Sequence, residues 1–242
     1  MNILSTIHYY KQQKKPLLVV LVDPEKEQAN RGLLPYLQYV DMVFVGGSTG
    51  NGVTDTIAML RKHTQARLVL FPGNVSQFTS DADALLFLSL LNAQTVDSLI
   101  IPHIHVAMSV LESHIETIPM GYILLDGGRT SSVEIATKCT PLSQKKIDSV
   151  VSTAVAGQLL GKQLIYLEAG SGAQIPVSTD IISAVRAKLQ VPLIVGGGIC
   201  TPEAMMQAFE AGADIVVIGN HFEQHPDEID DFVRIKRERY GE

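Results

Sequence analysis

The sequence predicts a single (β/α)8 barrel, on three observations. Eight short apolar segments recur along the chain, and eight is the number of strands that closes such a barrel. The segments are almost continuously apolar, as expected for parallel strands that are buried on both faces. The length of 242 residues, with 46% hydrophobic and 18% charged residues, suits one α/β barrel domain over residues 1–242.

The eight expected strands are spread over the whole chain. They cover residues 16–23, 41–47, 66–73, 84–90, 121–128, 164–170, 191–198 and 213–220. About a dozen residues separate the third strand from the fourth. That distance is short for a crossover helix together with its two loops, so we expect the helix between strands three and four to be reduced or missing.

The clearest helix start is at Thr201, which has the side chain of an N-cap residue. Pro202 then stands at the first helical position and Glu203 places an acid in the first turn. Gly212 suits the end of this helix. Its expected apolar stripe consists of Met205, Ala208 and Phe209.

Three further helices are expected from apolar spacing. One covers residues 143–161, one follows a cap at Ser178, and a charged helix covers residues 226–240. The inward-facing residues of the last two are Ile181, Ile182, Val185, Leu189, Ile229, Phe232, Val233 and either Ile235 or Lys236.

Composition excludes several classes of function. The net charge is −6 and there is no basic tract, so nucleic acid is not an expected partner. No apolar run approaches the ~18 residues of a membrane span, which leaves at most peripheral membrane contact. The N-terminal residues do not resemble a signal peptide. Two cysteines, Cys139 and Cys200, form no disulfide framework, so we expect a cytoplasmic protein and assign neither thiol a role.

Glycines gather where the expected strands end, which is the catalytic edge of a barrel. The last two strands matter most, because the loops after strands seven and eight often bind phosphate. Gly197 and Gly198 precede the Thr201 helix, while Gly219 and Asn220 follow strand eight. Backbone amides without a Cβ can approach an oxyanion closely. The pattern therefore predicts a phosphate site, with ordinary turns as the alternative.

The stretch YLEAGSGAQIP, residues 166–176, ends the sixth strand on a carboxylate. Glu168 lies one strand before the predicted phosphate loops, so it faces the molecule that carries the phosphate. A carboxylate in that place can accept a hydrogen bond from a substrate hydroxyl and remove its proton. The alternative is an ion-paired residue at the rim of the barrel.

Two other groups of residues invite a metal hypothesis. Asp23 ends the first strand and could hold Mg²⁺ together with Ser48, because this cation prefers oxygen ligands. An Asp-Pro turn is the equally weighted alternative. His103 and His105 have no third ligand at a suitable spacing, which disfavours a metal site there.

Seven motifs occur in one order across nearly the whole chain: LVDPEK, VGGS, FPGN, LSLLN, YLEAGSGA, VGGGI and VIGN. In this combination they resemble the geranylgeranylglyceryl phosphate synthase family, which includes bacterial heptaprenylglyceryl phosphate synthases. YLEAGSGA followed by GGGI and GN is specific, whereas GGGI alone occurs in many phosphate-binding barrels. The sequence departs from the family after Asn92, where AQTVDSLIIPHIHVAM replaces an aromatic-rich segment.

The resemblance implies a TIM barrel without its third helix and a Mg²⁺-dependent prenyltransferase. Such an enzyme joins sn-glycerol 1-phosphate to a polyprenyl diphosphate, with geranylgeranyl as the expected chain and heptaprenyl as the alternative. Asp23 and Ser48 match the magnesium positions, and Glu168 matches the catalytic glutamate. The implied glycerol phosphate site consists of Tyr166, Leu167, Glu168, Ala169, Gly170, Ser171, Gly172, Gly197, Gly198, Gly219 and Asn220. Relatives are homo-oligomers, either dimers or hexamers.

Two other functions fit the same residues. A sugar-phosphate isomerase or lyase would keep the phosphate loops and pair an acid with a base, for which Asp23 and Asp126 are available. A binding protein derived from the barrel would need the phosphate loops alone. It would have little use for Glu168, Asp23 and Ser48 together.

Overall fold

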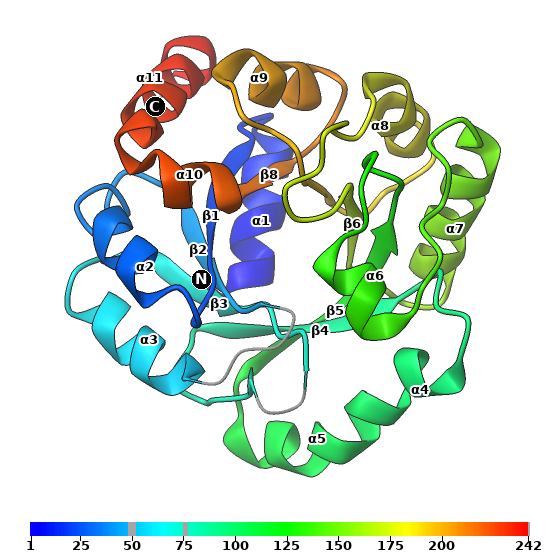
Figure 1. Ribbon diagram of the computed structural model, residues 1–242, viewed down its shortest axis with the longest axis horizontal. Helices are drawn as coiled ribbons and strands as arrows, with labels where there is room; N and C mark the ends of the chain where they lie inside the picture. Colours follow the sequence, from blue (N-terminus) through cyan, green and yellow to red (C-terminus); the bar gives the residue numbers. More distant parts are fainter. Residues whose placement is uncertain (48–51, 75–76, 242) are drawn as a thin grey trace.

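Eight parallel strands form a closed barrel in the computed structural model, which describes residues 1–47, 52–74 and 77–241 (Figure 1). The strands are β1 (Leu17–Val22), β2 (Met42–Val45), β3 (Arg67–Leu70), β4 (Ala84–Leu90), β5 (Glu116–Leu124), β6 (Leu164–Glu168), β7 (Leu193–Gly196) and β8 (Ile215–Ile218). They pair in chain order, and β8 closes the ring on β1. The predicted fold class is confirmed, and every predicted strand overlaps an observed one.

Alternating side chains of the strands divide the apolar residues into two cores. The inner core fills the barrel with residues such as Phe44, Met120 and Ile194. The outer core lies between strands and helices and includes residues such as Val43 and Leu167. Because a strand turns successive residues to opposite faces, each strand contributes to both cores. This explains why the strand segments are continuously apolar.

Helices surround the barrel and connect its strands (Figure 1). In chain order they are α1 (Ile3–Gln12), α2 (Glu27–Leu33), α3 (Val53–Arg61), α4 (Val96–Leu99), α5 (Ile101–Ser113), α6 (Ser132–Thr137), α7 (Ile147–Leu159), α8 (Thr179–Arg186), α9 (Pro202–Glu210), α10 (Asn220–Gln224), the 3-10 turn η2 (Pro226–Glu228) and α11 (Ile229–Tyr240). Of the described residues, none belongs to a helix that is long and apolar enough to cross a membrane.

The predicted helix starts are confirmed at α8 and α9. The Ser178 hydroxyl accepts a hydrogen bond from the amide of Ile181, and the Thr201 hydroxyl accepts one from the amide of Ala204. The helix predicted over residues 143–161 begins later, at Ile147, because Ser143 starts a turn whose carbonyl accepts the amide of Lys146.

The charged C-terminal helix also begins later than predicted, since the 3-10 turn η2 occupies its first residues. Of the two candidates for its inner face, Lys236 is the buried one. Its ammonium group lies 2.9 Å from the Asp41 carboxylate, so the charge is paired inside the protein. A buried lysine requires such a partner.

α1 closes the amino-terminal end of the barrel, which the sequence did not predict. Ile3 and Ile7 belong to the inner core. The Glu116 carboxylate, at the start of β5, accepts hydrogen bonds from the amides of Ile3 (2.6 Å) and Leu4 (2.9 Å). These bonds satisfy two of the free amides at the helix start and attach α1 to the strand.

The barrel wall is incomplete between β3 and β4. The described residues between these strands contain no α-helix, which confirms the predicted reduction. β3 pairs with β4 only at Val69–Ala84 and Leu70–Leu85. β4 continues to Leu90 and pairs along its whole length with β5. Among the described residues, no strand pairs with β4 beyond Leu85 on the side of β3.

Candidate active site

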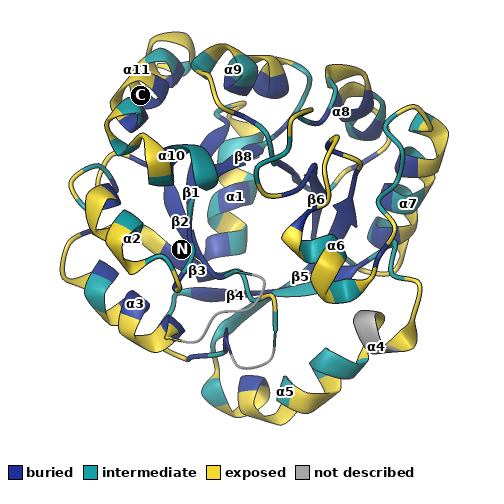
Figure 2. Ribbon diagram, viewed as in Figure 1, coloured by how far each residue is buried: buried dark blue, intermediate teal, exposed yellow. Residues whose placement is uncertain are grey.

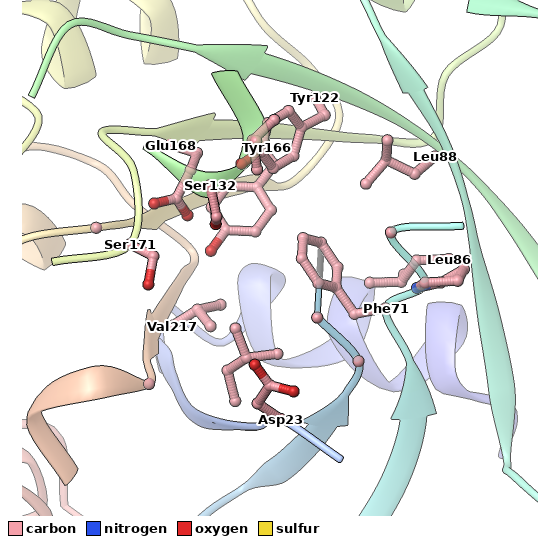
Figure 3. Close-up of a pocket in the computed structure, with 18 of the residues that line it drawn as sticks. Asp23, Phe71, Leu86, Leu88, Tyr122, Ser132, Tyr166, Glu168, Ser171 and Val217 are labelled. Atoms are coloured by element: carbon pink, nitrogen blue, oxygen red, sulfur yellow. The ribbon is translucent and has the colours of Figure 1, made fainter. Parts of the chain in front are cut away.

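A cavity of about 480 Å³ opens at the carboxyl ends of the strands. Asp23, Glu168, Ser171 and Asn220 are among its polar lining residues, and they come from different strand ends. Figure 3 shows three of these side chains beside the apolar residues of the same cavity. The cavity thus has a polar part near β6 to β8 and β1, and an apolar part near β4.

Glu168 is the buried acid of this cavity, with 8% of its surface exposed. It lies two residues after Tyr166 on β6, so both side chains point into the barrel. One carboxylate oxygen accepts the Gly170 amide at 2.7 Å, and the Tyr166 hydroxyl also donates to the carboxylate. Burial raises the pKa of Glu168, although these two hydrogen bonds counteract the shift. A carboxylate with a raised pKa is a stronger base than one in water.

Three aromatic rings separate Glu168 from the rest of the barrel interior. The ring centre of Tyr166 lies 5.3 Å from that of Tyr122 and 5.5 Å from that of Phe71. Burial raises the pKa of both tyrosines well above 10, so their hydroxyl groups stay neutral. Uncharged aromatic walls limit the access of water to the carboxylate.

Gly197 allows the loop after β7 to lie against Glu168. Its φ of +83° belongs to the left-handed region, where a side chain is strained. A Cβ at this position would overlap a Glu168 carboxylate oxygen, and it would lie 2.7 Å from the Gly170 amide nitrogen. The predicted phosphate loop and the predicted catalytic acid are therefore in direct contact.

Asn220 is oriented by two donors at the polar end of the cavity. Its carbonyl oxygen accepts hydrogen bonds from the Ser171 hydroxyl at 3.0 Å and from the Lys26 ammonium at 3.3 Å. The amide nitrogen of Asn220 is consequently the atom left to face an anion. Lys26 also pairs with Glu223 at 2.6 Å, which holds the cation beside this end of the cavity.

The structure brings most predicted site residues to the cavity. Those that line it are Asp23, Tyr166, Glu168, Ser171, Gly172, Gly197, Gly198, Gly219 and Asn220. Leu167 instead packs into the outer core. Ala169 donates its amide to the Gly196 carbonyl, and Gly170 donates its amide to Glu168. Gly170 thus supports the acid rather than offering its amide to a phosphate.

Asp23 lies on the cavity wall at the end of β1. One carboxylate oxygen accepts the Glu25 amide at 3.1 Å, while the main-chain carbonyl accepts the Asn30 side chain at 2.8 Å. A Cβ on Gly47 would come within 2.9 Å of both carboxylate oxygens, so this glycine leaves the space that the carboxylate uses.

The Asp23 carboxylate fits one ligand position of a magnesium site. The second predicted ligand, Ser48, lies outside the described residues. Groups of three or more histidine, cysteine, aspartate or glutamate side chains that could hold a metal are absent from the described part of the chain. Mg²⁺ often binds one or two carboxylates and completes its shell with water and phosphate oxygens, so the substrate would have to supply ligands here.

The geometry gives less support to the acid–base pair of an isomerase, which needs Asp126, and to a metal site at His103 and His105. Asp126 does not belong to the cavity lining, and its carboxylate accepts the Gly128 amide at 3.0 Å. His103 lines the cavity, where one ring nitrogen lies 2.6 Å from the Leu88 carbonyl oxygen. His105 is exposed on the same helix.

The apolar part of the cavity passes through the gap in the barrel wall. Leu86 and Leu88 point into the barrel, whereas Leu85 and Phe87 point out of it, yet all four line the cavity. A cavity that touches both faces of β4 must pass the edge of this strand beyond Leu85. Further walls are Pro102 and Val106 of α5 and Val133 and Ala136 of α6, of which Val133 also packs against the inner core. We call this part the apolar slot.

The sequence did not predict the walls contributed by α5 and α6. Apart from His103, Ser132 and Thr137, their lining residues are apolar, and they carry no motif. On β4, the segment ALLFLSLLNA has the composition of a buried strand, which does not distinguish a cavity lining from a core. The structure places five of its leucine and phenylalanine residues at the cavity: Leu85, Leu86, Phe87, Leu88 and Leu90.

Comparisons with known proteins agree with this geometry. The model of the PcrB family matches residues 9–236. The chain is 43% identical to a geranylgeranylglyceryl phosphate synthase of Zunongwangia profunda, over 92% of this chain and 97% of the relative. It is 34% identical to that of Korarchaeum cryptofilum, over 90% and 91%. A crystal structure of the Thermoplasma acidophilum synthase in complex with sn-glycerol-1-phosphate superposes with a TM-score of 0.90, at 29% identity over 98% of this chain and 99% of that chain.

Proposed function

The chain belongs to the PcrB family, and we infer that it is a prenyltransferase that joins sn-glycerol 1-phosphate to a long-chain polyprenyl diphosphate. One observation carries this proposal: a single cavity holds a buried carboxylate between an anion-binding end and an apolar slot. A small phosphorylated alcohol and a long apolar chain fit the two ends. The carboxylate then lies where the two substrates meet.

The proposed reaction exchanges one carbon–oxygen bond for another. The bond between the allylic carbon and the diphosphate breaks, and the diphosphate leaves with the electron pair. The 3-hydroxyl oxygen of glycerol phosphate forms the ether bond to that carbon, while its proton passes to Glu168. The barrel positions the hydroxyl and excludes water, which would otherwise capture the delocalised allylic cation.

The polar end of the cavity suits the phosphate of sn-glycerol 1-phosphate. Gly172, Gly198 and Gly219 bring backbone close to the cavity, and Asn220 presents its side-chain amide nitrogen. Lys26 adds a cation next to this amide. Gly197 lets the loop after β7 lie against the Glu168 carboxylate. A phosphate anchored at this loop would therefore leave the glycerol hydroxyls to extend toward Glu168.

The apolar slot suits the prenyl chain. On β4, α5 and α6 its walls are mostly aliphatic or aromatic, with His103, Ser132 and Thr137 as polar exceptions, so most of the surface buries hydrocarbon without requiring polar partners. We propose geranylgeranyl diphosphate as the donor, since relatives over most of the chain carry the name of that synthase. Heptaprenyl diphosphate is the alternative donor on the same scaffold.

We propose Mg²⁺ as the cofactor, held by Asp23, by Ser48 and by diphosphate oxygens. When bound, it would neutralise the charge that develops on the leaving diphosphate. We further propose that the protein is cytoplasmic and homo-oligomeric. The two cysteines are free, which agrees with a reducing compartment.

Incubation with sn-glycerol 1-phosphate, Mg²⁺ and prenyl diphosphates of C15 to C35 tests the function. We expect an ether-linked prenylglyceryl phosphate, and the longest chain accepted identifies the donor. If no such product forms, the prenyltransferase proposal fails. Turnover of a sugar phosphate in the same preparation would favour the isomerase alternative, which the position of Asp126 outside the cavity does not support.

Replacing Lys26 by methionine tests the anion-binding end. We expect the KM for sn-glycerol 1-phosphate to rise about tenfold with a smaller change in kcat, since hydrogen bonds to charged groups contribute about 1.5–3 kcal/mol. Because 40% of the Lys26 side chain is exposed, solvent screens its charge. The loss of binding free energy should therefore lie at the lower end of this range. Steady-state kinetics measure both constants. The exposed Lys188→Met is the control, and equal effects of both variants would contradict the role of Lys26.

A further inference from the structure

Arg129 is an exposed arginine beside the anion-binding end of the cavity. The strands of the barrel are mostly buried, whereas the segment after β5 is exposed at residues 128–130 (Figure 2). Within the described part of the chain, no aspartate or glutamate forms an ion pair with Arg129, and its guanidinium makes one hydrogen bond. In that bond, Nη1 donates to the Gly172 carbonyl oxygen at 3.4 Å. Most N–H groups of this cation are therefore available to a ligand.

The loop after β5 is docked on the loop after β6, which fixes the backbone near Arg129. The Gly127 carbonyl oxygen accepts the amides of Gln174 at 2.9 Å and Ile175 at 3.0 Å. A Cβ on Gly127 would overlap the main-chain carbonyl oxygen of Ala169, so a glycine is required for this close approach. Arg129 follows only two residues later. Its backbone is thus held against the loop that carries the predicted phosphate glycines.

Arg129 and Asn220 lie on two sides of the space in front of Gly172. A Cβ at residue 172 would lie 3.4 Å from Arg129 Nη1 and 3.4 Å from Asn220 Nδ2. Both nitrogen atoms are N–H donors, and they come from the loops after β5 and β8. Gly172 has no side chain, and its φ of +69° belongs to the region that favours glycine. The space between the two donors therefore stays open to an oxyanion.

The main chain of the loop after β6 has few amides left for a phosphate. The amide of Ala169 donates to the Gly196 carbonyl, and that of Gly170 donates to the Glu168 carboxylate. The amide of Ala173 donates to the Gly170 carbonyl. A phosphate on this loop therefore depends in part on side-chain donors from the neighbouring loops.

The charges of the cavity lining favour a further cation at the phosphate. Among the described lining residues, the carboxylates are Asp23, Glu168 and Glu223. Lys26 is the one lysine or arginine of that lining, and Glu223 already pairs with it at 2.6 Å. A phosphate monoester carries about −1.5 to −2 charges at pH 7, so the other carboxylates repel it. Arg129 has the unpaired positive charge that offsets this repulsion.

We propose that Arg129 binds the phosphate of sn-glycerol 1-phosphate together with Asn220, a role that rests on the proposed function. The guanidinium donates to phosphate oxygens from the side of β5, and the Asn220 amide nitrogen donates from the side of β8. Charge-assisted hydrogen bonds of this kind are stronger than neutral ones. Because Arg129 is exposed, it reaches the phosphate from the solvent side and covers the polar end of the cavity. It contributes to binding of the acceptor substrate and not to binding of the prenyl chain.

Replacing Arg129 by methionine in the full chain tests this role. Calorimetric titration should show about tenfold weaker binding of sn-glycerol 1-phosphate, the effect expected for a lost hydrogen bond between charged groups. Binding of inorganic phosphate, the probe for the anion alone, should weaken by a similar factor. The KM for the prenyl diphosphate should stay close to that of the wild type. Arg237→Met is the matched control, because Arg237 is exposed on α11 and its loss changes the net charge equally.

Chemical rescue separates direct contact from an indirect structural effect. Arg129→Ala leaves space at an exposed position, so millimolar guanidinium chloride should restore part of the affinity for sn-glycerol 1-phosphate. The same concentration of sodium chloride should not restore it, and circular dichroism checks that the variants are folded.

Equal affinities of wild type and Arg129→Met for sn-glycerol 1-phosphate would overturn the role of Arg129 and leave the proposed function intact. A higher KM for the prenyl diphosphate alone would also overturn it, because Arg129 would then bind the diphosphate. A wild type that does not bind sn-glycerol 1-phosphate would overturn the proposed function together with this inference.

Discussion

Replacing Glu168 by glutamine is expected to lower kcat by a factor of about 10²–10⁴, the range typical of a lost general base. Glutamine has nearly the same shape and can still accept the Gly170 amide, which Glu168 accepts at 2.7 Å. It cannot take the hydroxyl proton of glycerol phosphate. Binding of sn-glycerol 1-phosphate should stay within a few-fold of wild type, because the anion-binding residues are unchanged.

Calorimetric titration with sn-glycerol 1-phosphate and steady-state kinetics separate binding from turnover in this variant. Glu203→Gln, an exposed acid in the first turn of α9, is the control for the loss of one carboxylate near the same loops. Full activity of Glu168→Gln would remove Glu168 from the proposed chemistry. A large loss of glycerol phosphate binding would instead make Glu168 a binding residue.

The raised pKa of Glu168 also predicts an effect on stability. Burial raises the pKa of Glu168 in the folded protein above its usual value of about 4.5. The ionised Glu168 carboxylate therefore destabilises the fold. The free-energy cost of ionising Glu168 is absent at pH values below its unfolded-state pKa. It grows as the pH rises from that value through the folded-state pKa. Glu168→Gln should therefore have a higher Tm than wild type at pH 7. The difference should disappear near pH 4, which thermal unfolding at both pH values measures.

The barrel was predictable because burial on both faces leaves a simple pattern in the sequence. A strand such as β7 carries apolar residues for both cores and is followed by glycines, so it can be recognised from LIVGGG. The first half of β5 was missed because Glu116, Thr117 and Pro119 interrupt the pattern. α1 was missed because its role depends on Glu116, which is distant in the sequence.

The residues at the polar end of the site were predictable from the strand ends. The role of each of these residues was not. Topology brings the residues after parallel strands to one edge, which is why Glu168 and Asn220 could be assigned to one site. The hydrogen bond from Gly170 to Glu168 and the orientation of Asn220 by Lys26 depend on loop conformation. The apolar slot was not predictable, because its lining has the same composition as a core.

Asp23→Asn is expected to lower kcat by at least about 10²-fold, if Asp23 holds Mg²⁺ against the leaving diphosphate. A metal ion stabilises such a charge by several kcal/mol, and each 1.36 kcal/mol corresponds to a factor of ten. Asparagine keeps the shape of the side chain and one oxygen in the space that Gly47 leaves open. It lacks the negative charge, so raising the Mg²⁺ concentration should restore part of the activity.

Metal binding gives a measurement of this variant that does not depend on turnover. Calorimetric titration of Mg²⁺ in the presence of inorganic diphosphate should give saturable binding for wild type and a weaker affinity for Asp23→Asn. Asp126→Asn is the matched control, since Asp126 follows β5 in the same barrel but does not line the cavity. Unchanged Mg²⁺ affinity in Asp23→Asn would exclude this carboxylate as a ligand. Equal loss of prenyl transfer in both variants would contradict a role that is specific to Asp23.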